Sequence, residues 1–119
     1  MNQPTNKYNL EERTAKFGEE VIKFCRKINQ DTITKPIISQ LIRSSTSVGA
    51  NYMEANGASS RKDFKNKIFI CKKEIQETKH WLRMISICIS KEKDEAQKLW
   101  QEAQELTMIF QKITSSLNQ

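Results

Sequence analysis

Glu77 and His80 lie three residues apart within a predicted helix, at a spacing that is typical of some metal sites. A glutamate and a histidine at this spacing form part of the ligand set of di-iron sites in helix bundles. A complete site needs a second such pair, and the chain has a single histidine. We therefore predict that His80 is an ordinary surface residue and that the protein carries neither a metal ion nor another cofactor.

Residues for acid–base or nucleophilic catalysis do not form a recognisable motif. His80 is the one imidazole that could act as a base, and neighbouring Thr78 and Ser86 lack a third residue to orient them. Neither a P-loop nor a G-x-G-x-x-G pattern occurs. The sequence thus predicts that the protein is not an enzyme, and a metal- or redox-dependent bundle enzyme is the weakest alternative.

The same predicted helix carries a row of cationic side chains along one side, over about six turns or near 30 Å. The row consists of Lys62, Lys65, Lys72, Lys79 and Arg83. The phosphates of RNA or DNA are one candidate occupant, and the formal net charge of +6 is compatible with it. The alternative is a solvated flank paired with acids of the next helix, such as Glu95, Glu102 or Glu105. Few aromatic residues accompany the lysines, so base stacking is predicted to be minor.

An apolar flank extends the hydrophobic surface of this helix beyond what one four-helix bundle needs. With Ile68 at heptad position a and Phe64 at d, the flank occupies positions c, g and f. Its residues are Ile70, Trp81, Met84 and Ile87. For Trp81, cover by a neighbouring helix of the same chain and contact with another chain are equally good interpretations. Positions c and f, however, point away from the core of a four-helix bundle. An exposed apolar strip usually marks a contact with another chain, so we predict a homo-oligomer.

Four segments with the periodicity of amphipathic helices position these surfaces. They run over about 10–29, 35–56, 60–90 and 94–117. Pro36 suits a first helical turn, Ser60-x-x-Asp63 is a capping pattern, and Asn56-Gly57 is a stop signal. Because short connections favour antiparallel neighbours, residues 1–119 are predicted to form one all-α domain, an antiparallel up-down four-helix bundle.

Small side chains dominate the middle of the second predicted helix. They are Ser44, Ser45, Thr46, Ser47, Gly49 and Ala50. Such residues let another backbone approach closely, and their hydroxyls can bond to carbonyls one turn earlier. We therefore expect a close helix–helix crossing at this stretch.

Asn51 and Glu54 follow the small residues, one turn apart, and with Ser47 and Asp63 they form a predicted structural polar motif. A polar clamp to a neighbouring helix or subunit is the preferred interpretation, and a ligand site is the alternative. A buried Glu54 would need a cationic partner. The candidates are Arg43, Arg61 and Lys73.

Three cysteines, Cys25, Cys71 and Cys88, are far apart and show no disulfide or metal-site spacing. All three lie on or beside apolar stripes, which predicts small buried hydrophobic residues in a reducing compartment. The N-terminal residues lack a hydrophobic signal region, and no apolar run approaches the roughly 18 residues of a membrane span. We expect a cytoplasmic protein with no membrane partner.

Three blocks of residues together carry a family resemblance. They are Ser47-x3-Asn51-x2-Glu54, Lys62-Asp63-Phe64 and Lys73-Glu74-x2-Glu77-Thr78-x2-Trp81-Leu82. This pattern resembles the bacterial four-helix bundle proteins of the 23S rRNA intervening-sequence family, to which the accessory variability determinant of diversity-generating retroelements is similar. The family often has Asn-Ile-x-Glu-Gly where this chain has Ala55 in the last place, and the glycine comes two residues later, at Gly57.

The resemblance implies a four-helix bundle that assembles into a ring-like homopentamer, encoded within 23S rRNA insertions or near other mobile elements. For the accessory proteins it also implies a reverse transcriptase partner and a basic surface that binds nucleic acid. A pentamer would repeat the charge of +6 five times, which favours phosphate binding. The leading prediction is a non-enzymatic oligomeric accessory protein that binds RNA or DNA. The alternative is a scaffold that binds only protein, through the side of Trp81, Met84 and Ile87.

Overall fold

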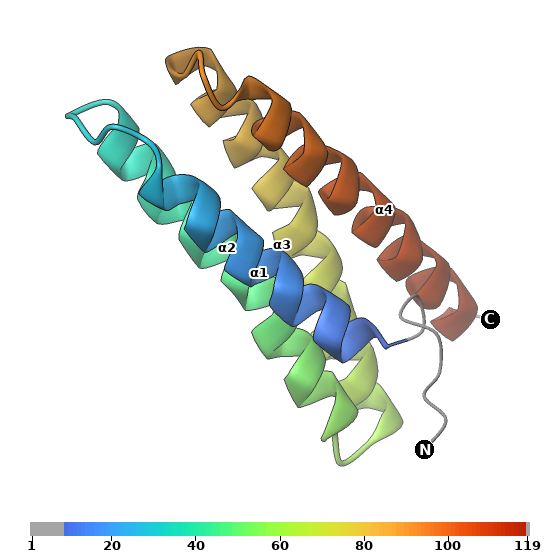
Figure 1. Cartoon of the computed structure of the whole chain (residues 1–119). Coiled ribbons are helices and arrows are strands. Elements are labelled where there is room, and N and C mark those ends of the chain that lie inside the picture. Colours follow the sequence, from blue (N-terminus) through green and yellow to red (C-terminus); the bar gives the residue numbers. More distant parts are fainter. Residues whose placement is uncertain (1–8, 119) are drawn as a thin grey trace, which may run out of the picture.

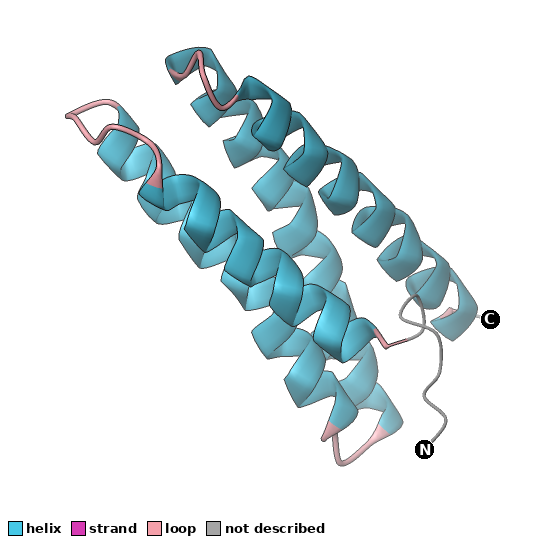
Figure 2. Cartoon of the chain, viewed as in Figure 1, coloured by secondary structure: helices cyan, strands magenta, loops and turns pink. Residues whose placement is uncertain are grey.

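A computed structural model describes residues 9–118, which form four α-helices (Figures 1 and 2). The helices are α1 (Leu10–Arg26), α2 (Thr34–Asn56), α3 (Arg61–Cys88) and α4 (Lys93–Leu117). Each helix runs antiparallel to the one before it. Among the helices that contact one another, packing is most extensive between α2 and α3 and least extensive between α1 and α4. The prediction of an all-α four-helix protein is confirmed.

The helices begin and end within three residues of the predicted positions. The largest difference is at α1, which ends at Arg26 instead of residue 29. There the N–H groups of Lys27 and Ile28 donate to the carbonyls of Phe24 and Cys25, at 3.1 and 3.2 Å. These bonds reach back three residues instead of four, so the last turn is tightened and the helix stops.

Side-chain hydrogen bonds stabilise the starts of three helices, through N-cap residues at α1 and α3 and through Asp31 before α2. Asn9 Oδ1 accepts from the N–H of Glu12 at 3.2 Å, and Ser60 Oγ accepts from the N–H of Asp63 at 3.0 Å. At α2, Asp31 Oδ1 accepts from the N–H groups of Thr34 and Ile33, at 2.8 and 2.9 Å. These bonds to the charged carboxylate lower the pKa of Asp31. The N-cap residue of α2 is Ile33, so the helix begins before Pro36, the start signal noted in the sequence.

Apolar stripes from all four helices meet in one core. Its largest fully buried side chains include Phe24, Leu41, Ile75, Leu82 and Phe110. On α3 the predicted positions a and d are buried from Ile68 to Ile85, as is Ile89 directly after the helix, whereas Phe64 at the start of the helix is partly exposed. This arrangement fixes which sides of α3 face outward, and so where its charged flanks lie.

The small residues of α2 do bring another helix close. A Cβ added at Gly49 would lie 3.4 Å from the backbone N of Ala15 and the carbonyl oxygen of Thr14, both in α1. On the other side of α2, Thr78 Oγ1 of α3 donates to the buried Ser44 Oγ at 2.9 Å. The stretch of small residues in α2 therefore packs against α1 on one side and α3 on the other, and the Ser44 hydroxyl is hydrogen-bonded across to α3.

The cysteines differ in exposure. Cys25 and Cys71 are buried, but Cys88 is exposed at the last residue of α3, so the prediction of three buried cysteines was wrong for Cys88. It lies at position g, where the helix ends before a neighbour covers it. Burial raises the pKa of Cys25 to about 11 and that of Cys71 to about 12.

We expect one thiol per folded chain to react quickly with a disulfide reagent at pH 8. The thiolate is the reactive form, and a pKa of about 11 leaves only about one in a thousand Cys25 thiols ionised at that pH. The absorbance of the released thiol counts the reactive groups, and peptide mass mapping should place the label on Cys88. Unfolded protein, in which all three thiols react, is the control. Fast labelling of Cys25 or Cys71 in the folded protein would contradict this prediction.

Candidate functional site

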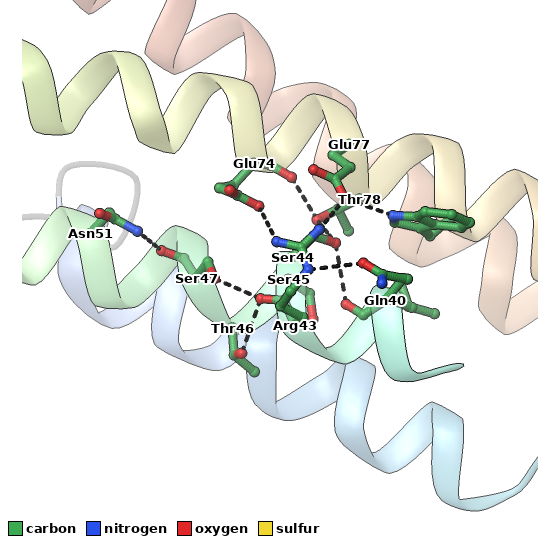
Figure 3. A network of polar contacts seen from close by, with 12 residues as sticks. Gln40, Arg43, Ser44, Ser45, Thr46, Ser47, Asn51, Glu74, Glu77 and Thr78 are labelled. Carbon is green, nitrogen blue, oxygen red and sulfur yellow. Dashed lines mark hydrogen bonds and ion pairs between the residues drawn. The ribbon is translucent and has the colours of Figure 1, made fainter. Parts of the chain in front are cut away.

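The side of α3 that faces α2 has its charges paired (Figure 3). Arg43 of α2 lies between Glu74 and Glu77 of α3, with 3.1 Å from Nη1 to Glu74 Oε1 and an ion pair to Glu77. Toward the N-terminus of α3, on the same side, Lys67 Nζ lies 2.7 Å from Glu54 Oε1 of α2. This flank therefore carries alternating charges that neutralise one another between the two helices.

The predicted polar motif is only partly a clamp between helices. Glu54 is exposed, with 52% of its side chain accessible, and its partner is Lys67, which was not among the three predicted candidates. Asn51 Nδ2 donates to the carbonyl of Ser47 at 2.8 Å, within α2 itself (Figure 3). Asp63 takes part in the capping of α3 through its N–H. Glu54 thus joins α2 to α3, while Asn51 and Ser47 form bonds inside one helix.

The opposite side of α3 faces α4 and carries the predicted row of cations. Lys79 shows the orientation, because its Nζ donates to Gln104 Oε1 of α4 at 2.6 Å and lies 5.5 Å from the ring centre of Trp100. Lys62 and Arg83 are exposed, and the other three are partly exposed. Among residues 9–118, the row makes none of the ion pairs. We call this surface the basic face, formed by Lys62, Lys65, Lys72, Lys79 and Arg83.

Three glutamates of α4 pair with cations on the α1 side and not with the basic face. Arg13 lies 2.7 Å from Glu102 and 2.9 Å from Glu105, and Lys27 lies 3.0 Å from Glu95. The hydrogen bond to Glu102 is the largest cause of the raised pKa of Arg13. The sequence alternative, in which these three glutamates neutralise the lysines of α3, is therefore not the arrangement that the structure shows.

A groove of about 490 Å³ continues the basic face between the C-terminal half of α3 and the N-terminal half of α4. Arg83, Ser86 and Ile87 line it from α3, and Lys93, Gln97 and Trp100 from α4. The lining includes two cations and no carboxylate. The prediction that aromatic residues are scarce beside the lysines overlooked Trp100, because that residue comes from the neighbouring helix.

The predicted oligomer-contact residues differ in how far the chain itself covers them. Trp81 Nε1 donates to Glu77 Oε2 at 2.9 Å, on the side that faces α2, and its ring contacts His80 edge-on. Ile70 and Met84 are also partly covered, so the chain itself accounts for some of this flank. Ile87 is 77% exposed and lies instead at the groove beside α4.

The described residues offer little to a metal ion. His80 is exposed, and the Glu77 carboxylate is engaged by Arg43 and Trp81. Over residues 9–118, no three His, Cys, Asp or Glu side chains gather as a metal-binding group. Within the same range, each helix is too short or too polar to cross a bilayer.

Comparison with known proteins places the chain in a family. The model of the family described as "23S rRNA-intervening sequence protein" matches residues 6–115. A crystal structure of a protein of unknown function from the S23 ribosomal protein family of Bacteroides thetaiotaomicron is similar, with 28% identity and a TM-score of 0.74. The match covers 87% of this chain and 96% of that one. None of the curated proteins matches significantly. With four helices and a family model that covers nearly its whole length, the chain belongs to the 23S rRNA-intervening sequence protein family.

Proposed function

We propose that this chain is a non-enzymatic accessory protein that binds the backbone of RNA or DNA through the basic face. The contrast between the two sides of α3 is the observation that carries this proposal. Toward α2, Arg43 and Lys67 are paired with carboxylates, whereas the five cations toward α4 make no ion pair within residues 9–118. Cations that are free of acidic partners can exchange their counterions for phosphates.

The spacing and type of these cations favour the nucleic-acid backbone over a small anion. The basic face extends along about 30 Å of helix, which is too long for one phosphate and suits a polyanion. Four of its five members are lysines, which bind phosphate as point charges without reading bases. Since the family is named for 23S rRNA, structured RNA is the natural first probe, and the cytoplasm is the proposed location.

Association of several copies is part of this proposal. The family resemblance suggests a homopentamer, and the partly exposed Ile70 and Met84 offer apolar surface for a contact between chains. A ring would repeat the basic face and raise the affinity for a long polyanion. A nucleic-acid enzyme, with a reverse transcriptase as the first candidate, is the proposed protein partner.

Binding to a fluorescent structured RNA is expected to weaken steeply with salt. Each phosphate neutralised on a double helix contributes about −0.9 to the slope of log K against log salt, so five contacts predict a slope of about −4.5. Between about 50 and 200 mM salt the affinity should then fall by two to three orders of magnitude. Fluorescence anisotropy measures this directly, and light scattering on the same sample gives the mass of the assembly.

A flat salt dependence, or no RNA binding at about 50 mM salt, would rule out the basic face as a phosphate site. The alternative function, a scaffold that binds only protein, is favoured by the exposure of Ile87. It predicts association that is unchanged by nuclease treatment and by variants of the basic face.

A further inference from the structure

The groove between α3 and α4 adds an aromatic surface to the basic face. Trp100 is partly exposed and lines this groove, while Lys79 Nζ lies 5.5 Å from its ring centre. Arg83 on α3 and Lys93 on α4 line the same groove. A flat indole next to cations combines the two kinds of group with which proteins bind single-stranded nucleic acid.

The polar groups of the groove retain capacity for a ligand. Lys93 Nζ donates to the carbonyl of Ser86 at 3.3 Å, which anchors the ammonium at the end of α3. An ammonium has three donors, so two are left for a phosphate. Gln97 is exposed on the α4 side and supplies both an amide donor and an acceptor. Without a carboxylate in the lining, an anion meets no repulsive charge there.

We propose that this groove binds one unpaired base of single-stranded RNA or DNA against the indole of Trp100, with an adjacent phosphate held by Arg83 and Lys93. This inference rests on the proposed function, because the basic face would guide the rest of the strand. The volume of about 490 Å³ lies within the range of small-ligand pockets. A base inside a duplex is already paired and stacked, so the groove selects unpaired nucleotides.

The first test compares three probes at about 50 mM salt by fluorescence anisotropy. They are a short oligothymidylate, the same strand with abasic sites, and a duplex of equal length. Stacking of one base predicts roughly tenfold tighter binding of the oligothymidylate than of the abasic strand. Trp100→Leu keeps apolar bulk but removes the aromatic face, and should abolish that difference. Trp100→Phe should restore most of it.

Arg83→Gln should weaken binding to the oligothymidylate and to the abasic strand alike, because it removes a phosphate contact. The matched control is Arg61→Gln. Arg61 lies at the first residue of the same helix, about 33 Å from Arg83 at the usual rise per residue. This control should bind all three probes like the parent. Circular dichroism and thermal unfolding confirm that each variant is folded.

A second measurement observes the indole itself. The chain has two tryptophans, so Trp81→Phe leaves Trp100 as the single one, and its emission should be quenched when the oligothymidylate binds. Equal binding of all three probes, no quenching, and parental affinity in Trp100→Leu would overturn the stacking site while leaving the basic face intact. If the parent bound neither oligothymidylate nor structured RNA, the proposed function itself would fail.

Discussion

Replacement of Lys65, Lys72 and Lys79 by glutamate is expected to lower RNA affinity by roughly three orders of magnitude at about 100 mM salt. These lysines lie at equal heptad spacing on the α4 side of α3, where no described carboxylate pairs with them. The substitution removes three phosphate contacts and adds three repulsive charges along the strand. Anisotropy with the structured RNA measures the loss, and the salt slope should become shallower.

The matched control reverses Lys16, Lys35 and Lys98, which are exposed on the other three helices. Each reversal lowers the charge by two, so both triple variants have a formal net charge of zero instead of +6. Both should keep the helicity and the mass of the parent, while only the α3 variant loses RNA. An α3 variant that bound like the parent, or an equal loss in both variants, would show that the basic face is not the site.

Gly49→Leu is expected to destabilise the protein by roughly 3 kcal/mol, which corresponds to a fall of roughly 10 °C in Tm. Even a Cβ at this position would lie 3.4 Å from the α1 backbone at Thr14 and Ala15. The further carbons of leucine have no room unless α1 moves away from α2. Urea unfolding followed by circular dichroism measures the free energy of unfolding.

Two alanine variants separate crowding from the loss of glycine. Gly49→Ala adds only the Cβ, whose contacts are at the limit of ordinary packing, and its cost should be far smaller than that of leucine. Gly57→Ala is placed where the nearest atoms are 3.9 Å away and φ is −98°, so it should be neutral or slightly stabilising. If Gly49→Leu were as stable as the parent, the close crossing of α1 and α2 would not contribute as described.

The sequence predicts the helices of this fold well because each one has a regular apolar stripe. The stripe of α3, for example, places Ile68, Ile75 and Leu82 in the core as its spacing requires. The capping pattern at Ser60 likewise gives the start of α3, since an N-cap depends on residues close in sequence. Such local signals do not depend on how the helices are arranged around one another.

Pairing between helices could not be derived in the same way. The stripe of α3 shows which flanks border the core, but not which flank faces α2 and which faces α4, because bundles of either hand bury the same stripe. Lys67, the partner of Glu54, was therefore not among the candidates. Glu102, which the alternative interpretation paired with lysines of α3, pairs with Arg13 of α1. Trp100 directly follows Leu99, a residue of the apolar stripe of α4. This position at the border of the stripe could have indicated that Trp100 lies beside a neighbouring helix.

The unequal extent of packing between the helices bears on the order in which the chain folds. Most contacts join helices that follow one another, and α1 meets α4 least extensively. Contacts between segments close in sequence form quickly, because little loop entropy is lost. The α2–α3 hairpin is therefore expected to form early in folding. The contact between α1 and α4, where Arg13 and Lys27 pair with glutamates of α4, is then expected to form last and to open first.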